Sequence, residues 1–126
     1  MRDLVAKMKL IPIKSIIRDK CMVFLDDSIV RGTQLKDNTA DLRAAGAREV
    51  HMRIACPPLT FPCNFLNFSQ SRSPMELATR KAIKQLEGEE GNHLEEYADA
   101  KSEKYRQMVE QIARNLDIDS LMYQDL

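Results

Sequence analysis

Residues 21–34 read CMVFLDDSIVRGTQ, and this stretch combines four features of one class of fold. An apolar run over residues 22–25 predicts a buried strand, two acids follow at its end, a loop of small residues comes next, and a helical pattern begins after it. In an open α/β sheet, ligands bind at the carboxyl ends of the strands, where loop N–H groups and a helix N-terminus face them. The stretch therefore predicts an anion-binding loop.

The two acids, Asp26 and Asp27, narrow the class of ligand. Adjacent carboxylates at a strand end cannot both point the same way, but both can accept hydrogen bonds from a vicinal diol or face a hydrated Mg²⁺. Ribose 5-phosphate, with a phosphate at one end and two adjacent hydroxyls, suits the loop and the acids together. No Lys follows Gly32, so the loop is not of the Walker type, and no G-x-G-x-x-G motif opens the helix.

Other folds also place two acids after a strand, among them response-regulator receivers and some phosphatases. A receiver needs another Asp that closes a later strand, whereas the next predicted strand, residues 50–55, leads into Cys56-Pro57-Pro58. The DxDxT pattern of phosphatases is absent. From the residues alone, phosphoribosyl binding and a purely structural turn both remain open.

The chain has 126 residues, which is small for a complete doubly wound enzyme, so we expect part of a larger protein. Its 19 basic residues balance its 19 acidic ones, which gives no net field to favour nucleic acid or a membrane surface. No apolar run is long enough to span a bilayer, no signal peptide opens the chain, and three cysteines do not form a secreted disulfide framework. We therefore expect a cytoplasmic location.

The remaining elements follow from periodicity. We expect a short strand over residues 13–17, a helix over residues 35–45 that ends at Gly46, and a half-exposed second strand towards the sheet edge, parallel to the first. Ser73-Pro74 has the form of a helix start, and the apolar pattern continues to residue 86, breaks at GEEGN, and resumes over residues 94–116. These charged segments predict two helices and a turn, exposed to solvent or to a partner, before a last strand over residues 121–123.

The run LDDSIVRGT resembles the phosphoribosyl-pyrophosphate (PRPP) signature of the type I phosphoribosyltransferases, and SIVRGT is most similar to the glutamine amidophosphoribosyltransferases. AGAREVHMRI resembles the next helix end and strand of that family, PPLTFPC the following turn, and DSLMYQDL a late strand. Lys9 and Leu10 resemble the end of its mobile active-site loop, and only residues 73–115 match poorly.

The resemblance implies an α/β fold with a partial, truncated doubly wound parallel sheet and additional carboxyl-terminal helices. Residues 1–126 would form a single partial phosphoribosyltransferase domain. Within it, residues 1–12 would be the tail of the mobile loop, residues 13–72 the β-loop-α-β core that binds PRPP, and residues 73–126 a helical layer with the last short strand.

The implied activity is that of a glycosyltransferase at the first step of de novo purine biosynthesis, which converts PRPP and glutamine to 5-phosphoribosylamine, glutamate and pyrophosphate. The chain on its own is expected to be inactive. A non-catalytic module that binds a phosphoribosyl compound or nucleotide to regulate a partner is the alternative, because the same loop would serve it.

By the resemblance, the two acids hold the ribose hydroxyls and Mg²⁺, the loop binds the 5-phosphate, and Lys9 closes over the pyrophosphate. No side chain is assigned as a catalytic acid or base. The implied PRPP-binding residues are Lys9, Asp26, Asp27, Ser28, Ile29, Val30, Arg31, Gly32 and Thr33.

Other parts of such an enzyme are not recognisable here. A glutaminase half needs an amino-terminal Cys nucleophile, and this chain opens Met1-Arg2-Asp3, so a glutaminase domain of the parent polypeptide is an implied partner, as is a homo-oligomer of the full-length enzyme. Some members carry a [4Fe–4S] cluster with a ligand at the position of Cys63. Because such a cluster needs four thiolates, it is expected only in the full-length parent.

Overall fold

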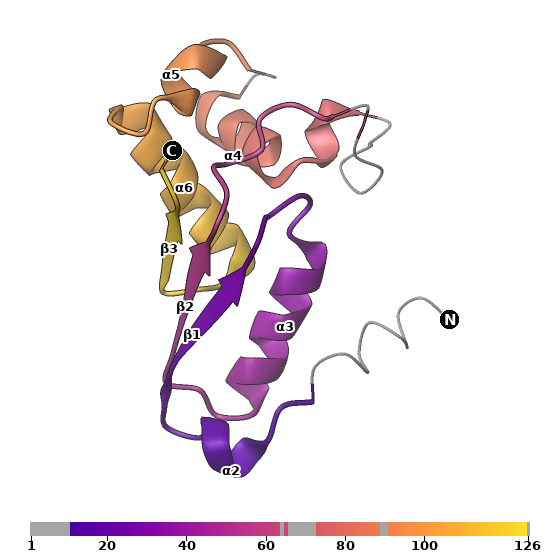
Figure 1. Ribbon diagram of the computed structural model, residues 1–126, viewed down its shortest axis with the longest axis vertical. Coiled ribbons are helices and arrows are strands. Elements are labelled where there is room, and N and C mark those ends of the chain that lie inside the picture. Colours follow the sequence, from indigo (N-terminus) through magenta and orange to yellow (C-terminus); the bar gives the residue numbers. More distant parts are fainter. Residues whose placement is uncertain (1–10, 64, 66–72, 89–90, 126) are drawn as a thin grey trace.

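The computed structural model describes residues 11–63, 65, 73–88 and 91–125. Three strands and six helical segments lie along this part of the chain (Figure 1). In chain order they are α2 (Lys14–Ile17), β1 (Cys21–Asp26), α3 (Thr33–Ala44), β2 (Glu49–Ile54), the 3₁₀ turn η1 (Pro74–Glu76), α4 (Ala78–Glu87), α5 (Leu94–Ala98), α6 (Glu103–Leu116) and β3 (Ser120–Tyr123).

The strands form one parallel sheet in the order β1-β2-β3. Cys21 lies beside Glu49 and Asp26 beside Ile54, so β1 and β2 are paired over their whole length. The α/β class, the parallel β-loop-α-β unit and the last strand are therefore confirmed. The second strand was expected near the edge and is instead the centre of this sheet, because β3 returns from the end of the chain to pair with it.

The helices pack on one face of the sheet. Val50, Met52 and Ile54 of β2 point into this core, which includes residues of α3, α4 and α6. On the other face Val23 and Leu25 of β1 are 60% and 75% exposed, so the prediction of a buried first strand is wrong for this face. Among the described residues, the covering helices of a doubly wound sheet are present on one side only.

Residues 14–17 form the short helix α2, so the strand predicted over residues 13–17 is wrong. The Ile17 N–H donates to the Ile13 carbonyl at 3.2 Å, and only Ile17 of this apolar run is buried, while Ile16 is 62% exposed. A strand at this position would need a neighbouring strand for its backbone groups, and a helical turn satisfies them locally.

The carboxyl-terminal helices are more interrupted and better buried than the sequence predicts. The Ser73 hydroxyl caps η1 by accepting from the Met75 N–H at 3.2 Å, and α4 begins only at Ala78. The helix predicted over residues 94–116 is divided into α5 and α6, because Ser102 starts a new helix by accepting from the Tyr105 N–H at 2.9 Å. One face of α4 and α6 enters the core, so this layer is structural and not only solvent-facing.

No helix in the described part of the chain is long and apolar enough to cross a membrane.

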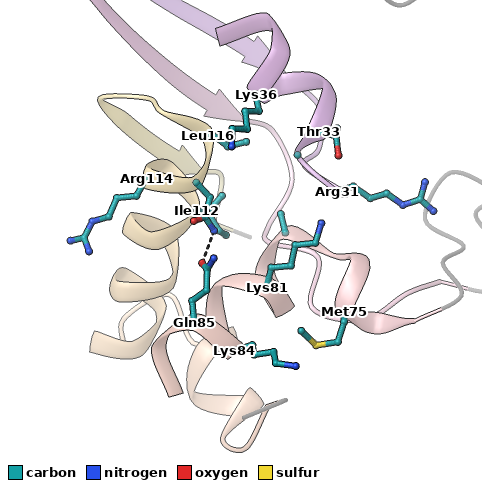
Figure 2. A pocket seen from close by; sticks show the side chains of 13 residues that line it. Arg31, Thr33, Lys36, Met75, Lys81, Lys84, Gln85, Ile112, Arg114 and Leu116 are labelled. Atoms are coloured by element: carbon teal, nitrogen blue, oxygen red, sulfur yellow. Dashed lines mark hydrogen bonds between the residues drawn. The ribbon is translucent and has the colours of Figure 1, made fainter. Parts of the chain in front are cut away.

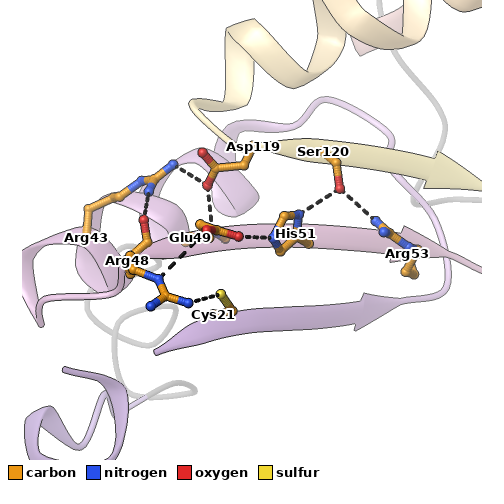
Figure 3. A network of polar contacts seen from close by, with 9 residues as sticks. Cys21, Arg43, Arg48, Glu49, His51, Arg53, Asp119 and Ser120 are labelled. Atoms are coloured by element: carbon orange, nitrogen blue, oxygen red, sulfur yellow. Dashed lines mark hydrogen bonds and ion pairs between the residues drawn. The ribbon is translucent and has the colours of Figure 1, made fainter. Parts of the chain in front are cut away.

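A polar network ties the ends of α3 and β3 to β2 (Figure 3). The Asp119 carboxylate accepts from the Val50 N–H at 2.7 Å and from the Arg43 guanidinium at 2.8 Å. Arg43 also donates to the backbone carbonyl of Arg48 at 3.3 Å. The hydrogen bond from Val50, with the contribution of Arg43, lowers the pKa of Asp119. The residue before β3 thereby fixes the position of that strand beside β2.

We predict that Asp119→Asn destabilises the protein by about 1 kcal/mol at neutral pH, because it removes a charge-assisted hydrogen bond from a partly exposed site. Since the folded-state pKa is lowered, this contribution exists above the ordinary Asp pKa of about 3.9 and disappears as the pH falls through the folded value. Urea unfolding measured from pH 7 to pH 3 tests this. The exposed Asp41→Asn variant is the control, and equal losses in both variants would contradict the prediction.

Candidate functional site

The two acids are placed by sheet hydrogen bonds that continue beyond the end of β1. The Ala55 N–H donates to the Asp26 carbonyl at 3.0 Å, and the Cys56 N–H donates to the Asp27 carbonyl at 3.1 Å. The backbone of both acids is therefore fixed to the chain that leaves β2. Their side chains extend from a rigid edge and not from a free loop.

The acid side chains diverge, as expected for neighbours at a strand end. Asp26 lines a cavity of about 660 Å³, and its carboxylate accepts from the Asp27 N–H at 2.8 Å. The Asp27 carboxylate accepts from the Ser28 hydroxyl at 3.1 Å and is not among the residues that line this cavity. Burial raises the pKa of the nearby Cys56 thiol, and Asp27 raises it further, so this thiol stays protonated at neutral pH.

Three contacts hold the loop that follows the acids against the helical layer. The Ile29 side chain is only 2% exposed and lies in the core. The Val30 carbonyl accepts from the Ala78 N–H at the start of α4, at 2.8 Å. Gly32 has a φ of +76°, and a Cβ at this position would lie 3.1 Å from a Leu116 methyl group. Ile29 and Gly32 can therefore contribute only backbone groups to a ligand.

The N-terminus of α3 closes one side of the same cavity. Its N-cap residue is Gly32, which has no side chain to cap the helix. The N–H groups of the first turn, beginning at Thr33, therefore receive no acceptor from the N-cap position. These donors and the helix dipole favour an anion. Arg31 instead pairs with Glu76 of η1 at 3.1 Å, and both side chains are partly exposed.

The cavity brings together most of the residues assigned from sequence and adds several that were missed. Gln34 and Asn38 of α3 also line it, and their spacing of four places them on one helix face, which the sequence could have indicated. The lining residues are Phe24, Leu25, Asp26, Ser28, Val30, Arg31, Gly32, Thr33, Gln34, Leu35 and Asn38.

Asp27 and Ile29 do not line this cavity, and two further assigned residues, Lys9 and Cys63, are not part of the site that the structure describes. Lys9 lies outside the described residues. Cys63 is a half-buried cysteine in the segment after β2. Within the described ranges, no group of three or more His, Cys, Asp or Glu side chains could hold a metal ion, so any ion at Asp26 and Asp27 would need further ligands from a bound molecule or water.

Several curated proteins similar to this chain are named amidophosphoribosyltransferase. It is 41% identical over 90 residues to the amidophosphoribosyltransferase of Pyrococcus horikoshii, a match that covers 71% of this chain and 20% of that protein. It is 44% identical over 80 residues to the Synechococcus elongatus amidophosphoribosyltransferase, covering 64% of this chain and 16% of that protein. A chloroplastic amidophosphoribosyltransferase of Glycine max is 48% identical over 65 residues, covering 52% of this chain and 11% of that protein.

Solved structures agree with these matches on the fold. Glutamine PRPP amidotransferase from B. subtilis, complexed with ADP and GMP, aligns with a TM-score of 0.61 at 24% identity, over 96% of this chain and 22% of that chain. A structure described as the allosteric regulatory enzyme of purine biosynthesis aligns with a TM-score of 0.59 at 25% identity, over 94% of this chain and 21% of that chain.

No family model matches the chain. The chain spans about a fifth of the length of the curated relatives it matches, or less. Their identity to this chain, together with the shared parallel α/β fold, makes this chain a homologue of one segment of the amidophosphoribosyltransferases.

Proposed function

We propose that the chain is the PRPP-binding portion of an amidophosphoribosyltransferase, the enzyme of the first step of purine biosynthesis. The observation that carries this proposal is one cavity lined both by Asp26, at the end of β1, and by the loop and N-terminus of α3. The names of the relatives point the same way. PRPP and glutamine would react to give 5-phosphoribosylamine, glutamate and pyrophosphate.

Different groups of the site would bind different parts of PRPP. The N–H groups of the loop and of the first turn of α3, with the hydroxyls of Ser28 and Thr33, would bind the 5-phosphate. The carboxylates of Asp26 and Asp27 would accept hydrogen bonds from the ribose hydroxyls. The reaction at the sugar depends mainly on placement, so these contacts would orient C1 of the ribose towards ammonia without a side-chain acid or base.

Mg²⁺ fits this site as a partner of the substrate. Proteins usually hold Mg²⁺ with one or two carboxylates together with substrate phosphates and water, and Asp26 and Asp27 provide such a pair. When bound, the ion would neutralise charge on the departing pyrophosphate. The two carboxylates would then serve both the metal and the ribose hydroxyls.

An iron–sulfur cluster does not fit this chain alone. Four thiolates are needed, and the sequence holds three cysteines, of which Cys21 lies exposed on β1. Cys63 would be a ligand only together with cysteines from the rest of the parent polypeptide.

The remaining partners also belong to the parent. A glutaminase domain would supply ammonia, and the full-length enzyme would be a homo-oligomer acting in the cytoplasm. Because the chain spans a fifth or less of its relatives' length, we expect it to produce no phosphoribosylamine on its own from PRPP and ammonia.

The first test of this proposal is binding of ribose 5-phosphate to the 126-residue chain. Titration should move the amide NMR signals of Ser28 to Thr33, because the phosphate would accept hydrogen bonds from this loop. Amides of the distant turn at Lys101 serve as the internal control. Loop signals that stay in place at saturating ribose 5-phosphate would contradict the proposal.

The second test replaces each acid in the full-length parent. Asp26→Asn and Asp27→Asn keep the side-chain size, and the loss of a charge-assisted hydrogen bond should weaken PRPP binding by about 1.5–3 kcal/mol, on the order of ten- to a hundredfold. The melting temperature should stay level or rise, because two neighbouring carboxylates repel each other. Asp41→Asn is the matched control. A sharp drop in melting temperature with intact PRPP affinity would show that the acids are structural.

A further inference from the structure

One face of the sheet has no helix packed on it in the described part of the chain. Its outer strands present apolar side chains there, because Val23 and Leu25 of β1 and Met122 of β3 are exposed. Met122 is paired with Arg53, whose neighbour Ile54 points into the helical core, so Met122 lies on the opposite, uncovered side. We call this side of the sheet the open face. Exposed apolar side chains that gather on one face mark it as a candidate interface.

The central strand adds charges of opposite sign to the open face. Glu49, His51 and Arg53 occupy alternate positions along β2 and lie in a row (Figure 3). The backbone positions of Glu49 and Arg53 are four residues apart, which in a strand is about 13 Å. The row therefore has a negative end and a positive end, with His51 midway between them.

Contacts within the chain neutralise the negative end but not the positive one. The Glu49 carboxylate contacts the His51 ring nitrogen Nε2 at 3.0 Å, and this hydrogen bond lowers the pKa of Glu49, which is therefore ionised at neutral pH. The Arg53 guanidinium donates to the Ser120 hydroxyl at 3.1 Å and to a backbone carbonyl at 2.8 Å, and both acceptors are uncharged. Within the described ranges, no acid forms an ion pair with Arg53.

This pattern becomes complementary to itself when a twofold axis crosses the row at His51. If two identical sheets pack face to face with antiparallel strands, each residue on one side of the axis meets the residue equally far on the other side in the second copy. Glu49 of one copy then faces Arg53 of the other, and the same contact forms again at the opposite end. Val23 is paired with His51, so it lies at the level of the axis and meets Val23 of the second copy. Packed sheets lie about 10 Å apart, a gap that a Glu and an Arg side chain span together.

We propose that the open face binds a second copy of this chain, in a twofold dimer with Glu49–Arg53 ion pairs at both ends of β2 and Val23 against Val23 at the centre. The inference does not depend on the proposed function, because none of these three residues lines the cavity of Asp26. Three strands give a small interface, and small interfaces belong to weak, transient complexes. We therefore expect a dissociation constant on the order of 100 μM.

Sedimentation equilibrium of the 126-residue chain, from about 10 μM to about 1 mM, measures this dimer directly. Val23→Asp places two carboxylates against each other at the axis and should weaken dimerisation about tenfold or more. Phe61→Asp is the matched control, because Phe61 is 65% exposed against 60% for Val23 and lies outside the sheet. This control variant should dimerise as the unmodified chain does.

Charge reversal tests the antiparallel arrangement. Glu49→Arg and Arg53→Glu each put like charges opposite one another at both ends of the row, so each variant alone should dimerise about tenfold more weakly or worse. An equimolar mixture of the two variants restores opposite charges at both ends. The mixture should therefore form a heterodimer with about the affinity of the unmodified chain, which a purely apolar association would not do. Amide NMR spectra of each variant check that it is folded.

Each contrary outcome identifies what is wrong. A chain that stays monomeric at about 1 mM overturns the proposal, and so does equal weakening by Val23→Asp and Phe61→Asp, since any exposed apolar side chain would then serve. Folded charge-reversal variants that form no heterodimer overturn it as well. If those variants do not fold, the comparison of Val23→Asp with Phe61→Asp still decides, because both change exposed residues. A monomeric chain together with a sharp fall in melting temperature for Val23→Asp in the full-length parent would mean that another segment of the parent covers the face, which overturns the dimer and leaves PRPP binding untouched.

Discussion

One backbone hydrogen bond, from the Ala78 N–H to the Val30 carbonyl at 2.8 Å, joins the loop after β1 to the helical layer. The carbonyl belongs to the loop of the candidate site, and the donor is the first residue of α4. This donor is one of the unpaired N–H groups that every helix start presents. The bond therefore satisfies α4 and positions the loop at the same time.

Two apolar contacts beside this bond make the arrangement rigid. Ile29 is buried in the core. Gly32 lies so close to Leu116 of α6 that a Cβ added at Gly32 would be 3.1 Å from a Leu116 methyl carbon. The loop thus becomes a thin wall, with the Asp26 cavity on one side and, on the other, a second cavity of about 740 Å³ that α4 and α6 also line (Figure 2). The carboxyl-terminal helices, which resemble the family least in sequence, are the support on which the loop depends.

The part of the site that lies within one stretch of sequence could be predicted from it. Asp26, Asp27 and the loop are contiguous, and strand pairing places them at the sheet edge as expected. This second cavity could not be predicted, because Lys36 and Lys81 come to line it only through the packing of α3 near α4 and α6. No local pattern marks such a pair.

The wrong predictions about the fold also arise from contacts that the local sequence pattern does not show. Residues 13–17 are apolar enough for a strand, but none of the strands in the described part of the chain pairs with them, and of this run only Ile17 is buried in the core. The second strand was placed near an edge because its residues alternate, and the alternation instead reflects one covered and one open face of the sheet. Ser102 divides the long helical pattern through a cap that competes with continuation of the helix.

We propose that the left-handed conformation of Gly32, packed on Leu116, gives the loop the shape with which it would bind a phosphate. Gly88 has nearly the same φ, +78° against +76°, but a Cβ there would meet nothing within 4 Å. The most direct measurement is therefore ribose 5-phosphate affinity, by calorimetry, of Gly32→Ala beside Gly88→Ala. Each substitution carries a backbone cost of about 1–2 kcal/mol in stability. We predict that only Gly32→Ala loses ribose 5-phosphate binding, and Gly32→Ala binding with unchanged affinity would contradict the account.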